Sequence, residues 1–301
     1  MQTTHLGSSS LTCTRIAYGC WRLSGSEGGP RLPDADGILA IRTAFDAGYT
    51  LFDLADIYGR GESERLFGLA LRDGQGMRQR ITVATKCGIC PPWDGATHCY
   101  NSSSAYIIAS VEESLRRLQV DFVDLLMIHR PDHLASPEEI ATAFAQLRTQ
   151  GKVREFGVSN FRPSQLTALQ KHCSMRLIVN QVEVSLAALD CLDDGTLDQC
   201  LAEGITPMAW SPLAKGQLLG APKDECGQKL QALLAKLAAE KNATPAAIAI
   251  AWLLRHPSRM VPIVGSTNPD RIRSAAVADS VELTREEWYT LLTASRGTPL
   301  P

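Results

Sequence analysis

The chain has 301 residues, of which 45% are hydrophobic and 21% are charged, a composition typical of a folded globular protein and not of a disordered one. The 30 lysines and arginines against 32 aspartates and glutamates give a net charge of −2, which provides no reason to expect nucleic acid or an anionic membrane as a partner. The first residues lack a signal-peptide pattern, and no run of about 18 apolar residues could cross a bilayer. We therefore expect a cytoplasmic protein that acts on a small molecule.

Eight short apolar segments recur along the chain and predict buried strands of a parallel sheet. They are residues 16–21, 50–56, 81–86, 122–129, 153–160, 177–183, 205–211 and 260–267. Amphipathic helices are predicted between them. The helix signals are most legible in "SPEEIATAFAQLRTQG", where Ser136 is the expected N-cap, Pro137 the first helical residue, and Glu139 the partner in a capping box.

This alternation over one chain, with no linker or break in composition, predicts an α/β fold: a single (β/α)8 TIM barrel in one domain spanning residues 1–301. A doubly wound sheet is the competing architecture. It is disfavoured because no G-x-G-x-x-G follows the first strand and no P-loop motif occurs.

Nine cysteines are scattered without regular spacing, and a reducing cytosol would keep most of them as small buried hydrophobic residues. Cys87 and Cys90 form a C-x-x-C pair, which alone is a weak signal for redox chemistry or metal binding. No second such pair or nearby pair of histidines completes a zinc site. We expect no metal, and a redox role of either cysteine stays open.

Polar and aromatic side chains stand where the predicted strands end, the edge at which such barrels assemble their active sites. They are Asp53, Tyr58, Lys86, His129, Ser159, Asn160, Gln181, Trp210, Ser211, Gly265 and Ser266. Each alone could be a helix cap, a solvated tip or a rim residue. Together, the ionisable groups among them predict one functional site.

Four of these residues suit one reaction. The phenol of Tyr58 has an ordinary pKa near 10, so we expect Lys86 to lower it by stabilising the phenolate. Asp53 would hold Lys86 charged, and a neutral His129 could donate a hydrogen bond to a substrate oxygen. This group could protonate an alkoxide as it forms.

The same residues resemble the motifs of the aldo-keto reductases over nearly the whole chain. "FDLADIYG" carries Asp53 and Tyr58 in the matching places, "VATKCG" carries Lys86, and "VDLLMIHRPD" carries His129. The resemblance implies that these four are catalytic, and that a hydride passes from NADPH to an aldehyde or ketone without a Rossmann fold.

The resemblance also implies the cofactor site. Ser159, Asn160 and Gln181 would bind the nicotinamide carboxamide, and Trp210 would stack on the ring, with a plain core or rim aromatic as the alternative. The whole expected set is Gly19, Trp21, Ser159, Asn160, Gln181, Trp210, Ser211, Pro212, Leu213, Gly265, Ser266, Thr267 and Arg271.

Arg271 decides the expected cofactor. It falls in the first turn of a helix that begins at Pro269, whose amide groups would face a phosphate, and it could pair with the 2′-phosphate of NADP. NADPH is therefore favoured over NADH. Gly265 and Ala275 depart from the lysine and asparagine that often occupy these positions, so NADH stays the less favoured alternative.

The expected substrate pocket consists of Trp21, Tyr58, Trp93, Tyr100 and His129. Trp93 and Tyr100 lie in residues 91–104, which form a longer connection than is usual in such units; incidental surface aromatics are the alternative there, as plain packing is for Trp21. The family's long C-terminal loop is short here, so we expect an open pocket that accepts diverse small carbonyl compounds.

Two other functions stay open. A Schiff-base aldolase could use Lys86 as a nucleophile, although an ion pair with Asp53 would keep the amine charged. A cofactor-binding, redox-sensing subunit with little turnover is the second. We expect a monomer, with an oligomer as the open alternative; the sequence fixes neither the physiological substrate nor the direction of the reaction.

Overall fold

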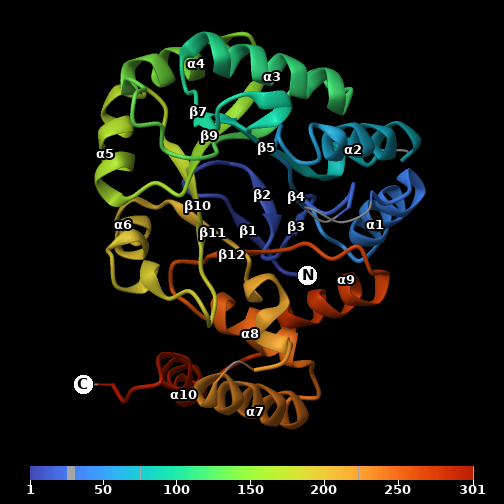
Figure 1. Cartoon of the computed structure of the whole chain (residues 1–301), viewed down its shortest axis with the longest axis vertical. Coiled ribbons are helices and arrows are strands. Elements are labelled where there is room, and N and C mark those ends of the chain that lie inside the picture. Colours follow the sequence, from blue (N-terminus) through green and yellow to red (C-terminus); the bar gives the residue numbers. More distant parts are fainter. Residues whose placement is uncertain (26–30, 75, 223, 301) are drawn as a thin grey trace.

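Eight parallel strands pair in chain order and close into a barrel (Figure 1). The computed structural model describes residues 1–25, 31–74, 76–222 and 224–300. The barrel strands are β3 (Ala17–Gly19), β4 (Leu51–Asp53), β5 (Thr82–Cys87), β8 (Val123–Ile128), β9 (Val153–Ser159), β10 (Leu177–Glu183), β11 (Thr206–Trp210) and β12 (Val261–Val264). The predicted (β/α)8 barrel is confirmed; seven strands lie within the segments that the sequence marked as apolar, and β5 extends one residue beyond its segment, to Cys87.

Helices cover the outer surface of the barrel, one after each strand. They are α1 (Asp34–Asp46), α2 (Glu62–Asp73), α3 (Ser104–Leu118), α4 (Pro137–Thr149), α5 (Pro163–His172), α6 (Thr196–Glu203), α8 (Pro245–Leu254) and α9 (Pro269–Ala276). Two more helices, α7 (Glu225–Glu240) and α10 (Arg285–Arg296), pack against each other below α8 in Figure 1. No helix in the described part of the chain could span a membrane, because none combines sufficient length with sufficient apolar character.

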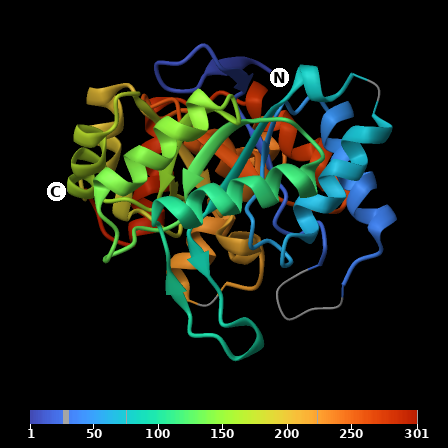
Figure 2. The ribbon, with the colours of Figure 1, turned by 90° about the horizontal axis from the view of Figure 1, so that it is seen from above.

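Two short hairpins lie at opposite ends of the barrel (Figure 2). The first pairs β1 (Thr3–His5) with β2 (Thr12–Thr14); Cys13 of β2 and Leu6, which follows β1, belong to the apolar cluster inside the barrel. It therefore closes the amino-terminal end of the barrel. The second hairpin pairs β6 (Ile89–Cys90) with β7 (Cys99–Tyr100) and follows β5 at the other end.

The helix ends follow local side-chain chemistry. Ser136 is the N-cap of α4 as predicted, but it accepts a hydrogen bond from the Glu138 amide and its hydroxyl donates to the Glu138 carboxylate. The capping box expected with Glu139 is therefore wrong. A complete capping box begins α10, where Thr284 and Glu287 bond each other's backbone amides.

A glycine sets how closely α2 approaches α3. A Cβ atom at Gly68 would lie 2.6 Å from the carbonyl oxygen of Arg117 and 2.8 Å from that of Leu118. Both atoms are backbone and cannot move aside without shifting α3. The two helices therefore touch only because position 68 has no side chain.

Gly68→Ala should lower the free energy of unfolding by about 1–3 kcal/mol through overpacking, although alanine is about 1 kcal/mol better in a helix. Urea denaturation followed by circular dichroism measures the change. Thr142→Ala, at an exposed position of α4, is the control and should be neutral or slightly stabilising. A Gly68→Ala protein as stable as that control would contradict the close approach.

Candidate active site

Polar residues meet at the carboxyl ends of the strands because each strand turns every second side chain into the barrel. Four apolar residues of the interior cluster each precede a predicted site residue by two positions. The pairs are Leu51 and Asp53, Ala84 and Lys86, Met127 and His129, and Met208 and Trp210. The predicted site residues thus form the layer directly above the apolar filling of the barrel.

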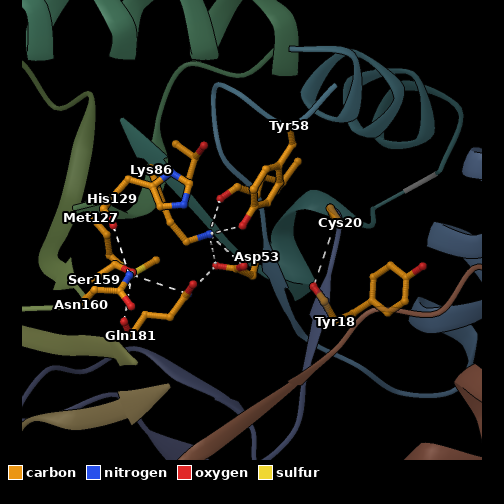
Figure 3. Close-up of polar contacts among 12 residues, drawn as sticks. Tyr18, Cys20, Asp53, Tyr58, Lys86, Met127, His129, Ser159, Asn160 and Gln181 are labelled. Carbon is orange, nitrogen blue, oxygen red and sulfur yellow. Dashed lines mark hydrogen bonds and ion pairs between the residues drawn. The ribbon is translucent and has the colours of Figure 1, made fainter. Parts of the chain in front are cut away.

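Lys86 is the centre of this layer and has no exposed surface. Its ammonium nitrogen Nζ lies 2.8 Å from Oδ2 of Asp53, 2.8 Å from the carbonyl oxygen of Leu54 and 3.2 Å from the hydroxyl of Tyr58 (Figure 3). An ammonium group has three N–H donors, so this geometry uses all of them. Oδ1 of Asp53 accepts a further bond, of 2.8 Å, from the amide of Gln181.

The ion pair keeps Lys86 charged. Burial alone would lower the pKa of the ammonium group, but Asp53 and Tyr58 together raise it above its ordinary value. A Schiff-base aldolase needs a neutral amine, so this arrangement speaks against the aldolase reading.

The pKa of Tyr58 is shifted in the direction opposite to the one expected. Burial is the largest cause and raises the pKa of Tyr58. Lys86 lowers this pKa, but its effect is outweighed by burial together with Asp53, which also raises the pKa. The expected net lowering is wrong because the sequence could not weigh the loss of hydration against one neighbouring cation. The consequence is a phenol that stays protonated at neutral pH and so carries a proton that it can donate.

His129 lies beside Tyr58, with the ring centroids 5.9 Å apart and the rings nearly perpendicular. Burial, Lys86 and Arg130 hold the pKa of His129 well below its usual range, so the imidazole is neutral. Its Nδ1 atom is buried and has no hydrogen-bond partner among the described residues. A neutral imidazole has one N–H donor and one acceptor nitrogen, and since His129 lines the neighbouring cavity, its other ring nitrogen can bond a ligand there.

A cavity of about 1260 Å³ opens onto these groups and extends across the barrel mouth to α9. Its lining includes Asp53, Tyr58 and His129 at the barrel mouth and Arg271 and Ala275 of α9. The expected cofactor residues that line it are Gly19, Trp21, Ser159, Asn160, Gln181, Trp210, Ser211, Pro212, Leu213, Gly265, Ser266 and Arg271. Thr267 is not among the lining residues. A cavity of this size that is lined by the side-chain amides of Asn160 and Gln181 and by the cation of Arg271 suits a dinucleotide.

Comparison with known proteins decides the family. A model described as the Aldo/keto reductase family matches residues 15–295. The chain belongs to the aldo-keto reductase family. Over 296 residues it is 40% identical to the uncharacterized oxidoreductase YcsN of Bacillus subtilis strain 168, covering 97% of each chain. Over 302 residues it is 40% identical to a 6-dehydroglucose reductase of Novosphingobium aromaticivorans, covering 98% of this chain and 96% of the relative.

The structural comparison agrees. The fold is similar to that of the thermostable aldo-keto reductase Tm1743, solved with the inhibitor epalrestat, with a TM-score of 0.86 and 29% sequence identity; the match covers 98% of this chain and 100% of that one. The resemblance stated from the motifs is therefore confirmed. This aldo-keto reductase is an NAD(P)H-dependent oxidoreductase of the kind that acts on small carbonyl compounds.

The amides expected at the nicotinamide end form one connected network. Asn160 has a left-handed backbone, with φ of 60°, and its side-chain amide donates to Oγ of Ser159 at 2.7 Å. The indole N–H of Trp210 donates to Oδ1 of Asn160 at 3.0 Å, and Ser159 donates to the carbonyl of Gln181 at 3.0 Å. These bonds fix the side chains before any ligand arrives, which is the preorganisation that a binding site needs.

The amino-terminal end of α9 differs from the expectation. The side chain of Asn268 accepts hydrogen bonds from the amides of Asp270 and Arg271, at 3.0 and 3.1 Å. The prediction that these amides face a phosphate is wrong for those two, because a cap already satisfies them. The Arg271 side chain is exposed and has no acidic partner among the described residues, whereas Arg273 pairs with Asp270 at 3.3 Å.

Two of the expected substrate-pocket aromatics lie away from the main cavity. Trp93 packs under Arg60, whose guanidinium carbon lies 5.0 Å from the centroid of the Trp93 ring. Trp93 does not line the cavity. Tyr100 lines an adjoining pocket of about 320 Å³ that shares Arg130 and Asn160 with the main one. Trp21 lines the main cavity with Tyr58 and His129.

Three cationic residues that line the cavity were not predicted from the sequence: Arg22, Arg130 and Lys215. Arg22 and Arg130 each directly follow a residue that was singled out, and Lys215 follows Leu213 by two positions. The residue after a recognised site residue was therefore the available signal. The described residues contain no cluster of three potential metal ligands.

Asp56 is a buried carboxyl group close to this site. Its Oδ1 atom has no hydrogen-bond partner in the described part of the chain. Burial raises its pKa to about 7, with Glu64 adding to the rise and Arg117 opposing it. In the unfolded chain an aspartate has a pKa of about 3.9, so folding favours the protonated form. This contribution to stability is complete below about pH 4 and is lost as the pH rises through about 7.

Asp56→Asn should remove this dependence. The free energy of unfolding of the variant, relative to the wild type, should rise between about pH 4 and about pH 7, by up to about 1.4 kcal/mol for each pH unit. Urea denaturation at a series of pH values measures the difference. Asp94→Asn, at an exposed loop position, should show no such rise; a pH-independent difference for Asp56→Asn would refute the assignment.

Proposed function

We propose that this aldo-keto reductase uses NADPH to reduce small aldehydes and ketones to alcohols, with Tyr58 as the proton donor. The observation that carries the proposal is the contact of Lys86 with both Asp53 and the Tyr58 hydroxyl beside the cavity. A relative named 6-dehydroglucose reductase, matched over 98% of this chain, supports carbonyl reduction.

The bound reduced nicotinamide supplies the hydride. Tyr58 donates its proton to the carbonyl oxygen as negative charge develops there, so that the alcohol leaves with one hydride and one proton added. The buried ammonium of Lys86 stabilises the phenolate that remains, because opposite charges 3.2 Å apart interact strongly where water is excluded. His129, which is neutral, donates a hydrogen bond that orients the carbonyl group.

Asp53 positions Lys86 directly, and Gln181 positions it through Asp53. The carboxylate holds the ammonium nitrogen at 2.8 Å, and the amide of Gln181 holds the other carboxylate oxygen at the same distance. We propose that these contacts keep the cation aimed at Tyr58 throughout the reaction. Ser159 and Asn160 would bind the nicotinamide carboxamide. Arg130 lies over one face of the Trp210 ring, with its guanidinium carbon 5.7 Å from the ring centroid, so Trp210 would stack on the nicotinamide with its other face.

Tyr58→Phe should lower kcat for 4-nitrobenzaldehyde by about 10²–10⁴-fold, the usual effect of losing a general acid, while the Kd for NADPH stays within about twofold. Turnover is followed by nicotinamide absorbance and binding by titration calorimetry. Tyr289→Phe, on the distant helix α10, is the matched control and should be active. A wild type as inert as Tyr58→Phe that still binds NADPH tightly would favour the sensing alternative, and loss of NADPH affinity in the variant would contradict the role of Tyr58.

The preference for NADPH depends on Arg271. Arg271 lines the cavity and has no acidic partner among the residues described, and a 2′-phosphate is the group that distinguishes NADP from NAD. A charge-assisted pair of this kind contributes about 1.5–3 kcal/mol.

Arg271→Ala should therefore raise the Kd for NADPH by about tenfold or more and leave the Kd for NADH nearly unchanged. Fluorescence titration with both cofactors measures the two constants. Arg273→Ala, in the same helix but outside the cavity lining and paired with Asp270, should change neither. Equal losses of both cofactors in Arg271→Ala would remove the argument for the 2′-phosphate.

A further inference from the structure

The β6–β7 hairpin places two cysteines directly opposite each other at the mouth of the barrel. The strands are antiparallel, and their register pairs Ile89 with Tyr100 and Cys90 with Cys99. Opposite residues of an antiparallel pair have Cα atoms about 4.5 or about 5.5 Å apart. A disulfide requires about 4.4–6.8 Å, so the backbone already holds Cys90 and Cys99 at bonding distance.

The two thiols also interact and differ in exposure. All nine cysteines lie in the described part of the chain and are free, and Cys99 alone among them is exposed. Burial raises the pKa of the Cys90 thiol; a hydrogen bond with Tyr106 lowers it and the adjacent Cys99 thiol raises it. An oxidant in solution therefore reaches Cys99 first, with the Cys90 thiol next to it.

The C-x-x-C motif that the sequence suggested is not the reactive pair. Cys87 is buried in the apolar cluster between the barrel and its helices, and burial, Asp56 and Glu64 raise the pKa of its thiol well above the ordinary value. Because the thiolate is the reactive form, Cys87 is inert. The partner of Cys90 is the cysteine across the hairpin.

We propose that Cys90 and Cys99 are a redox-modification site that forms a reversible disulfide with a peroxide as the oxidant. The Cys99 thiol ionises, and its thiolate attacks the peroxide; the O–O bond breaks to give a sulfenic acid and hydroxide, which takes up the released proton and becomes one water. The Cys90 thiol then attacks that sulfur, the S–S bond forms, and the sulfenic oxygen leaves as a second water. One hydrogen peroxide is reduced as two thiols are oxidised, and a dithiol reagent reverses the step.

The position of this bond gives it a consequence for the cavity. Ile89, beside Cys90, lines the main cavity, and Tyr100, beside Cys99, lines the adjoining pocket. Figure 2 shows the hairpin, in teal, extending away from the barrel and held to it at the ends of these two strands. The disulfide would close residues 91–98 into a loop and fix both neighbours in place.

The test uses the full chain and a readout that does not depend on turnover. The protein is reduced, desalted, treated with stoichiometric hydrogen peroxide and alkylated under denaturing conditions, and intact mass and a non-reducing peptide map are recorded. We expect each chain to lose two hydrogens, to gain two fewer alkyl groups, and to yield one cross-linked peptide pair that contains Cys90 and Cys99. Dithiothreitol should reverse all three changes.

Single variants distinguish this site from general oxidation. Cys90→Ser and Cys99→Ser should abolish the intramolecular cross-link, and Cys90→Ser should accumulate a sulfenic acid at Cys99 that dimedone captures. Cys173→Ser and Cys226→Ser, at two partly buried cysteines elsewhere, should form the cross-link like the wild type. Sulfinic acid at Cys99 of the wild type, a disulfide-linked dimer, or a bond that persists in Cys99→Ser would overturn the proposal.

Discussion

The fully buried ammonium group of Lys86 is the constraint on which the active site depends. A cation without water needs compensating contacts, because an unpaired buried charge costs several kcal/mol. Asp53, the carbonyl of Leu54 and the Tyr58 hydroxyl supply them. The same contacts that make burial tolerable also bring a carboxylate, a cation and a phenol together, so structural necessity and the proposed chemistry coincide at one nitrogen atom.

Much of the fold was predictable because it rests on local patterns. Near-continuous apolar segments predicted the barrel strands, and the capping residue Ser136 marked where α4 begins. The grouping of Asp53, Lys86 and His129 was also predictable, since residues at the carboxyl ends of parallel strands in a closed barrel must converge.

The remaining features depend on contacts between distant segments or on burial, which a single sequence does not display. The raised pKa of Tyr58 reflects how much hydration it loses in the fold. The partner of Cys90 is set by the register of the β6–β7 hairpin, in which eight residues, 91–98, separate the two cysteines. Arg130 was missed because its role at two cavities appears only once the loops are placed.

The apolar filling beneath the polar layer has a thermodynamic consequence. Leu51, Ala84, Met127 and Met208 occupy the barrel interior two residues before Asp53, Lys86, His129 and Trp210, and the hairpin of β1 and β2 seals the base of that column. Side chains that stand on a close-packed support have few alternative rotamers. Their loss of conformational freedom thus occurs once, when the chain folds, and need not be repeated at each encounter with a ligand.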